Sequence, residues 1–145
     1  MVKVLIKKLD PAVEIPIYKT TGSSGVDLMA FTKQPIKIDP KKSCLVPTGI
    51  AVAFSEEYEI QIRPRSGLAA KNNISVLNTP GTIDSDYRGE IKIILFNHGN
   101  SQFVINNKDR VAQMILMPVH KMNFEQVESL PNTVRGEGGF GSTGK

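Results

Sequence analysis

The sequence predicts an all-β fold, a jelly-roll-like β-barrel or sandwich with one short helix and a flexible C-terminal arm. Short runs of β-branched and apolar residues alternate with polar ones at a period of two, which is the pattern of strands with one buried face. Proline and glycine separate these runs, and no long amphipathic helices lie between them, which argues against a parallel α/β sheet. The 145 residues fit one domain, over residues 1–130, followed by an arm over residues 131–145.

The strands are expected where this period or a dense apolar run occurs. The clearest is residues 58–63, in which Tyr58, Ile60 and Ile62 alternate with polar side chains. Only residues 67–73 have the composition of a helix, and Ser66 stands where an N-cap is expected. The other expected strands are residues 2–6, 36–38, 50–54, 74–77, 90–96, 102–105 and 111–119.

The last fifteen residues differ from the rest of the chain. Residues 131–145 contain five glycines, and their only apolar side chains are Val134 and Phe140. Such a segment cannot bury enough surface to offset the entropy of ordering it, so we expect it to be mobile in the free protein. Phe140 is then either incidental or lands on something that the arm covers.

Bulk properties limit the function. A net charge of +4 attracts phosphates, whether they belong to nucleic acid or to a small nucleotide. Sparse aromatic residues and no Trp argue against a single-strand-binding surface. Lysines interrupt the N-terminal apolar run, and no stretch approaches the ~20 apolar residues of a membrane helix, so we expect a soluble, cytoplasmic protein. Cys44 is the only cysteine and is expected to be a small buried hydrophobe.

Five polar segments could carry chemistry. Residues 63–69 join arginines, a hydroxyl and helix-start amides, which suit an anion or simply cap the helix. Residues 78–91 gather carboxylates and Tyr87 beside the predicted sheet, for general-base catalysis or for turns. Asp109 and Arg110 pair with each other or cap a turn, and Asp27 sits in an apolar run and needs partners. Residues 135–144 offer glycine amides, hydroxyls and an arginine for phosphate.

The order of these segments resembles that of the five motifs of the homotrimeric dUTPase family. The motifs are Gly-Val-Asp-Leu at 25–28, Pro-Arg-Ser-Gly-Leu-Ala at 64–69, Gly-Thr-Ile-Asp-Ser-Asp-Tyr-Arg-Gly-Glu-Ile at 81–91, Asp-Arg-Val-Ala-Gln at 109–113 and Arg-Gly-Glu-Gly-Gly-Phe-Gly-Ser-Thr-Gly at 135–144. The resemblance covers nearly the whole chain, and the third and fifth motifs are highly specific. Thr82, where the family often has an apolar residue, is a mild departure.

The resemblance implies a jelly roll that assembles as a homotrimer and hydrolyses dUTP to dUMP and pyrophosphate. This activity limits uracil incorporation into DNA and supplies dUMP for dTMP synthesis. It implies that each active site uses more than one subunit and that the arm of one chain closes over a site on another. By resemblance, Asp84 is the general base for the water that attacks the α-phosphorus. The implied substrate-binding residues are Arg65, Ser66, Gly67, Asn78, Gly81, Thr82, Ile83, Tyr87, Lys92, Gln113, Arg135, Phe140, Gly141, Ser142 and Thr143.

The implied roles divide the nucleotide into parts. Uracil is read by Asn78 and by backbone groups of the hairpin, with the returning strand near Lys92, while Tyr87 packs beneath the deoxyribose and leaves no room for a 2′-hydroxyl. Hydrogen bonding excludes cytosine, and the hairpin backbone excludes the methyl of thymine. Mg²⁺ rides on the triphosphate with water completing its octahedron, so no direct protein ligand is expected. Asp27 either contacts the waters of that metal or is structural.

Two rival functions differ in what they need. A dCTP deaminase of similar fold carries a different third motif, and zinc deaminases need H-x-E and P-C-x-x-C patterns, which are absent. A non-catalytic nucleotide or nucleic-acid binding module is permitted by the basic charge but has no need of Asp84. We therefore expect dUTP as the substrate, no stable nucleic-acid partner and no membrane contact.

Overall fold

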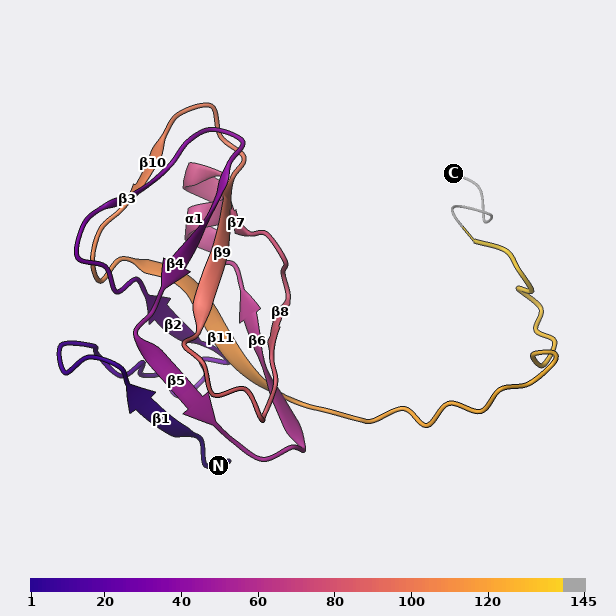
Figure 1. Ribbon diagram of the computed structural model, residues 1–145. Helices are drawn as coiled ribbons and strands as arrows, with labels where there is room; N and C mark the ends of the chain where they lie inside the picture. Colours follow the sequence, from indigo (N-terminus) through magenta and orange to yellow (C-terminus); the bar gives the residue numbers. More distant parts are fainter. Residues whose placement is uncertain (140–145) are drawn as a thin grey trace.

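The protein is described by a computed structural model that places residues 1–139 and is built almost entirely of β-strands (Figure 1). One helix interrupts them, so the predicted all-β class is confirmed, and the described strands form a sandwich rather than a closed barrel. The elements are β1 (Leu5–Lys8), β2 (Val26–Met29), β3 (Ile36–Ile38), β4 (Ser43–Pro47), β5 (Ile50–Ala53), β6 (Tyr58–Arg63), α1 (Ser66–Asn72), β7 (Ile74–Val76), β8 (Gly81–Ile83), β9 (Lys92–Asn97), β10 (Phe103–Ile105) and β11 (Arg110–Pro118).

Two larger antiparallel sheets face each other across one hydrophobic core. One has the strand order β2-β11-β6-β8 and the other β4-β9-β7, and both cross between distant parts of the sequence. Two strand pairs, β1 with β5 and β3 with β10, lie at the bottom and top of the molecule in Figure 1. Leu28, Val46, Ile93 and Leu95 are among the fully buried core side chains, and they come from both larger sheets. Burying such side chains is the main favourable contribution to folding.

Several elements differ from those expected from the sequence. The first strand is Leu5–Lys8 rather than residues 2–6, because its register is set by pairing with β5, with Leu5 opposite Ala53. Strands β2, β4 and β8 were not among the expected strands. β8 is only three residues long and exists because Gly81 and Ile83 pair with Ile62 and Ile60 of β6. Its formation therefore depends on a tertiary partner and not on a local pattern.

The start of the helix also differs from the prediction. Ser66 is the first helical residue, and Arg65, with φ −88° and ψ 127°, occupies the N-cap position without a side-chain cap bond. Pro64 keeps the residue before it extended, so β6 ends at Arg63 and the helix begins two residues beyond the proline. Asn73 ends the helix in the left-handed conformation, at φ 56°. The side chain of Arg65 is thereby left for another partner.

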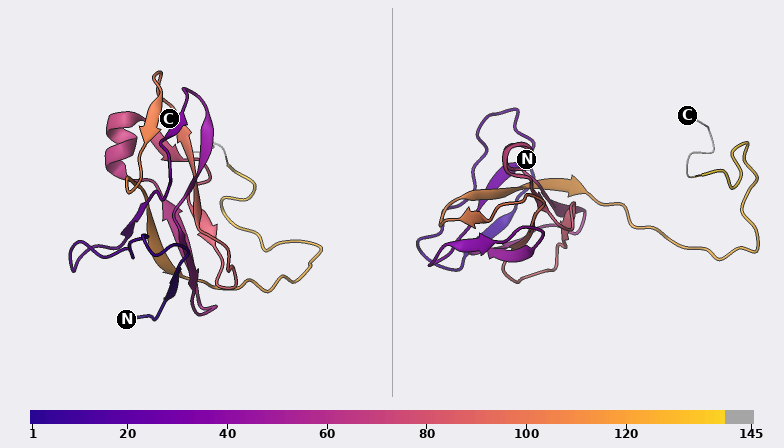
Figure 2. Two further views of the ribbon diagram at one scale, coloured as in Figure 1. Left: turned by 60° about the vertical axis from the view of Figure 1, so that its left-hand side comes forward. Right: turned by 90° about the horizontal axis from the view of Figure 1, so that it is seen from above.

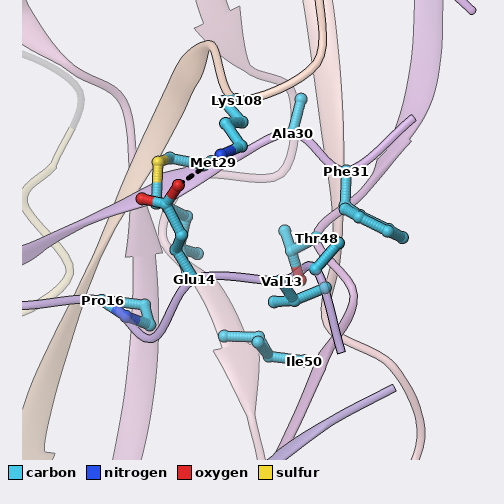
Figure 3. A pocket seen from close by; sticks show the side chains of 11 residues that line it. Val13, Glu14, Pro16, Met29, Ala30, Phe31, Thr48, Ile50 and Lys108 are labelled. Carbon is cyan, nitrogen blue, oxygen red and sulfur yellow. Dashed lines mark hydrogen bonds and ion pairs between the residues drawn. The ribbon is translucent and has the colours of Figure 1, made fainter. Parts of the chain in front are cut away.

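The N-terminal loop between β1 and β2 is fixed to the body by Val13. This side chain is only 5% exposed and packs against Gly49, whose φ of +69° suits the β4–β5 turn. A Cβ at Gly49 would lie 2.4 Å from Val13 Cγ2, so the glycine also makes room for the loop. Figure 3 shows Val13 near Phe31 and Ile50 in a small hollow, with Lys108 Nζ of the β10–β11 turn 2.5 Å from Glu14 Oε1. The Lys108 ammonium lowers the pKa of Glu14 through this hydrogen bond and its charge.

The chain leaves the body after β11. Residues 120–137 are exposed throughout, and the views in Figures 1 and 2 show this segment extending away from the sheets. This exposed segment therefore begins before residue 131, where the arm was expected to start. Exposed apolar side chains, including Phe124 at 83% and Leu130 at 80%, lie along it. No helix among residues 1–139 is long and apolar enough to cross a membrane.

Cys44 is half-buried on β4, and it packs against the hydrophobic core. Partial burial raises the pKa of its thiol, because a thiolate is poorly solvated there. Its environment is therefore that of a small hydrophobic side chain, although it is less buried than the sequence suggested.

Candidate active site

Five of the residues expected to bind substrate line one open hollow. The hollow lies between β8 of one larger sheet and β9 of the other. Ile62, Val76, Ile93 and Ile94 complete its wall. Backbone pairing holds its edges, since Leu77 N donates to Ile94 O at 2.8 Å and Gly81 is the register partner of Ile62. The five expected residues are Asn78, Gly81, Thr82, Ile83 and Lys92.

The apolar wall and the polar rim give this hollow the character of a small-molecule site. Ile62, Val76 and Ile93 are buried, whereas Asn78, Thr82 and Lys92 are exposed. Gly81 lets the Asn78 side chain approach, because a Cβ there would lie 3.2 Å from Asn78 Nδ2 and 3.3 Å from Ile62 Cβ. Concave sites that combine apolar walls with a few convergent polar groups suit flat, polar-edged ligands.

Asp84 and Tyr87 stand on the turn that follows β8. Tyr87 N donates to Asp84 O at 3.1 Å, and Arg88 Nη1 donates to Ser85 O at 2.6 Å, so the turn is closed by one backbone bond and by the Arg88 side chain. The Asp84 carboxylate is exposed, and within residues 1–139 no cation lies at ion-pair distance from it. Tyr87 is 45% exposed, and its hydroxyl donates to Glu90 O at 3.1 Å.

A second group of expected residues gathers at the end of β6 around Asp27. Arg65 Nε lies 2.8 Å from Asp27 Oδ1, and Arg110 Nη1 lies 3.2 Å from Asp27 Oδ2. Arg65 Nη1 also donates to Arg110 O at 2.9 Å. Asp27 is therefore paired with two guanidinium groups. The pairing brings two positive charges together at the edge of the sheet.

Gln113 and the helix start lie beside this arginine pair. Gln113 faces Asp27 on β2 and Arg63 on β6 across the sheet, and its Nε2 donates to Pro64 O at 2.9 Å. Ser66 and Gly67 follow Arg65 at the exposed start of α1. Amides, a hydroxyl and guanidinium groups converge here, which is a suitable set of donors for phosphate oxygens.

Sequence reasoning did not identify Arg110 as a site residue. The sequence left two alternatives for Asp109 and Arg110, a pair with each other or a turn cap. Asp109 caps the preceding turn, since its Oδ2 accepts from Asn106 N at 2.7 Å, while Arg110 pairs with Asp27 instead. The position of Arg110 in the fourth motif was the available signal. Glu90 was also missed: its Oε1 accepts from Gly49 N at 2.9 Å, and its Oε2 lies 3.6 Å from Lys92 Nζ.

Of the expected arm residues, the structure describes Arg135. It is exposed, and within the described residues its Nε donates to Gly138 O at 2.7 Å, inside the arm itself. Phe140, Gly141, Ser142 and Thr143 lie outside the described residues.

Within residues 1–139, no three His, Cys, Asp or Glu side chains are grouped closely enough to hold a metal ion. His98 is exposed and shares a hydrogen bond of 2.8 Å with Ser75 Oγ.

Known proteins resemble this chain over nearly its whole length. The dUTPase family model matches residues 12–144. A deoxyuridine 5′-triphosphate nucleotidohydrolase of Rickettsia bellii is 53% identical over 143 residues, which are 98% of this chain and 95% of the relative. The protein of the same name from Chlamydia pneumoniae is 54% identical and covers 94% of this chain and 95% of its own. That from Fusobacterium nucleatum is 49% identical and covers 100% of both chains.

Solved structures share the fold. The dUTPase of Staphylococcus bacteriophage 80alpha with dUpNHpp has a TM-score of 0.88 at 22% identity, covering 99% of both chains. The dUTPase of phage phi11 of S. aureus, described with a structural Mg(II) ion, has a TM-score of 0.80 at 19% identity and covers 90% of this chain and 99% of its own. At these identities the likeness establishes the jelly-roll fold, whereas the family model and the curated relatives establish the family. The chain belongs to the dUTPase family, whose enzymes hydrolyse dUTP.

Proposed function

We propose that the hollow between β8 and β9 binds the uracil of dUTP and that Asp84 activates the water that hydrolyses it. The observation that carries this proposal is the convergence of five expected substrate residues on one hollow, with Asp84 directly after β8. Uracil presents an accepting O4 and a donating N3, which suit the Asn78 amide and the β8 backbone. Cytosine reverses both groups and would leave buried partners unpaired, at a cost of about 1–3 kcal/mol each.

The chemical step needs a base placed on water. Asp84 is exposed and, in the described part of the chain, is not neutralised by an ion pair, so its carboxylate is free to accept a proton. As the water oxygen bonds to the α-phosphorus, its proton passes to Asp84. The bond between that phosphorus and the oxygen bridging to the β-phosphorus breaks, and pyrophosphate leaves with the bridging oxygen. The products are dUMP and pyrophosphate.

The arginine cluster, formed by Arg65 and Arg110 on Asp27, is proposed to hold the phosphates. Arg65 uses Nε and Nη1 on Asp27 and Arg110, which fixes the plane of its guanidinium group and leaves its other N–H groups to donate. Ser66, Gly67 and Gln113 surround it. We assign these residues to the phosphates of a nucleotide whose uracil is bound by a neighbouring subunit of a homotrimer. Arg135, with Phe140 and residues 141–143, would come from an arm of the trimer.

Mg²⁺ is proposed to enter with the triphosphate. The exposed residues around the arginine cluster and the hollow suit a metal that keeps most of its waters and takes phosphate oxygens as ligands. Both oxygens of Asp27 contact guanidinium groups, and this supports a structural role for Asp27 rather than one on the metal. When bound, the ion would neutralise charge on the phosphates and favour departure of pyrophosphate.

The proposed reaction has a clear place in nucleotide metabolism. Removing dUTP limits the incorporation of uracil into DNA, and the dUMP formed is the precursor that is methylated to dTMP. We propose no nucleic-acid partner for this role.

Replacing Asn78 with alanine is expected to lower kcat/KM for dUTP about tenfold, because the base loses one buried hydrogen bond of about 1–3 kcal/mol. The ratio of kcat/KM for dUTP to that for dCTP should fall as well. Steady-state assays of pyrophosphate release measure both quantities. Asn100→Ala, the same change at an exposed position outside the hollow, is the matched control and should leave them unchanged. An Asn78→Ala enzyme with wild-type selectivity would contradict the assignment of the hollow to uracil.

A further inference from the structure

The ring of Tyr87 lies directly over the backbone of Gly89. A Cβ built on Gly89 would stand 2.3 Å from Tyr87 Oη, 2.5 Å from Cζ and 2.9 Å from Cε2. Carbon atoms in ordinary contact are about 3.5–4.0 Å apart. The space occupied by the tyrosine ring is therefore space that any side chain at position 89 would take.

Gly89 leaves this space open for the ring, and it is not required there by a positive φ. The described glycines with positive φ are Gly49 and Gly136, and Gly89 is not one of them. Its φ therefore lies outside the left-handed region that disfavours alanine. The nearest obstacle to a side chain at position 89 is the ring of Tyr87, because the three nearest atoms beyond the neighbouring residues all belong to it.

The backbone beyond Gly89 is tied to the β4–β5 turn. Glu90 Oε1 accepts from Gly49 N at 2.9 Å, Ile91 N donates to Ile50 O at 2.9 Å, and Thr48 Oγ1 donates to Ile91 O at 2.5 Å. Ile91 is fully buried. By contrast, the Tyr87 ring is 45% exposed and is held by one hydrogen bond to Glu90 O. A methyl group at position 89 would therefore displace the ring rather than the backbone segment that leads into β9.

We propose that Gly89 is a positioning residue that sets the preference for deoxyribose over ribose. It acts by leaving room for the Tyr87 ring against the turn, so that the ring forms the floor beneath the sugar. This inference rests on the proposed function, in which Tyr87 packs under the deoxyribose and leaves no room for a 2′-hydroxyl. Glu90 and Thr48 support the same arrangement by fixing the backbone segment before β9, over which the ring lies.

The test compares Gly89→Ala, Tyr87→Ala and the double variant, with Gly22→Ala as the matched control. At Gly22 an added Cβ meets no atom within 4 Å, and the backbone is not in the positive-φ region. The readout is the ratio of kcat/KM for dUTP to kcat/KM for UTP, together with the thermal midpoint. Gly89→Ala is expected to lower the ratio about tenfold or more, with the fold kept, and Gly22→Ala should leave it at the wild-type value.

The double variant shows whether Gly89 acts through the ring. In the Tyr87→Ala background, Gly89→Ala should produce no further fall in the ratio, because the group that it displaces is gone. NMR provides a second readout: the Tyr87 ring protons, assigned by their absence in Tyr87→Ala among three tyrosines in all, should shift in Gly89→Ala and not in Gly22→Ala.

The contrary outcomes are distinct. If Tyr87→Ala lowers the ratio and Gly89→Ala does not, the inference about Gly89 is wrong and the role of Tyr87 stands. If Tyr87→Ala leaves the ratio unchanged, the sugar assignment in the proposed function is itself wrong, and the role of Gly89 falls with it. If Gly89→Ala unfolds while the double variant folds, the ring cannot move, and the inference is overturned.

Discussion

Asp84→Asn is expected to lower kcat for dUTP by about 10²–10⁴-fold, which is the usual contribution of a positioned general base. The amide keeps the size and shape of the carboxylate but cannot accept the proton of the attacking water. Binding should be largely kept, because Asp84 is proposed to act on water and not on the base or sugar. The measurements are single-turnover hydrolysis of dUTP and the Kd of a non-hydrolysable α,β-imido analogue.

The matched control for this prediction is Glu56→Gln, which makes the same carboxylate-to-amide change at an exposed position in the β5–β6 turn. It should leave kcat and Kd unchanged. Near-normal turnover in Asp84→Asn would contradict the assignment of the base. A large rise in Kd with little change in kcat would instead place Asp84 among the binding groups.

Deleting residues 134–145 is expected to reduce kcat/KM for dUTP by about 10²-fold or more while the proposed trimer is kept. Arg135 and the glycine-rich motif that follows are proposed to close over a bound nucleotide, and loss of such a closing segment exposes and misplaces the phosphates. The assembly should persist, because the described core is built from strands that end at Pro118. Hydrolysis assays and light scattering measure the two quantities.

A chain that lacks only Lys145, which lies beyond the motif, is the matched control and should behave as the full chain. Full activity of the longer truncation would contradict the closing arm. A truncated protein that is inactive and also monomeric would assign the segment to assembly rather than to closure over the nucleotide.

Local pattern was enough to predict the class of the fold. Tyr58, Ile60 and Ile62 alternate with polar residues, and β6 follows this period over Tyr58–Arg63. The same period located β3, and a dense apolar run located β11 within one residue of its bounds. Both signals lie in the strand's own sequence and do not depend on the partner strand.

The missed strands lacked such a local signal. β8 is three residues of a polar hairpin that becomes a strand by pairing with β6, and β4 buries only Val46 among five residues. Tertiary pairing decides these elements, and a single sequence does not record it. The helix start was shifted for a different reason: a serine at its expected boundary favours capping, but Pro64 sets where the strand ends and the helix begins.

The candidate site, like the fold, was predicted where the sequence carries a signal and missed where tertiary contacts decide. The family resemblance implied that Asn78, Gly81 and Lys92 act on one ligand, and these residues line one hollow. They did not predict that Asp27 pairs with Arg65 and Arg110, because those partners are 38 and 83 residues away in sequence. The contact of Tyr87 with Gly89 depends on a side-chain rotamer, which no spacing of residues encodes.

The most direct test of the central claim is pyrophosphate release from dUTP, UTP, dCTP and dTTP, measured with Mg²⁺ and then with EDTA. The account predicts rapid release from dUTP alone, lost when EDTA removes the metal. Ammonia release from dCTP would place the protein among the deaminases of similar fold. No reaction with any of the four nucleotides would contradict the account and leave a jelly-roll binding protein.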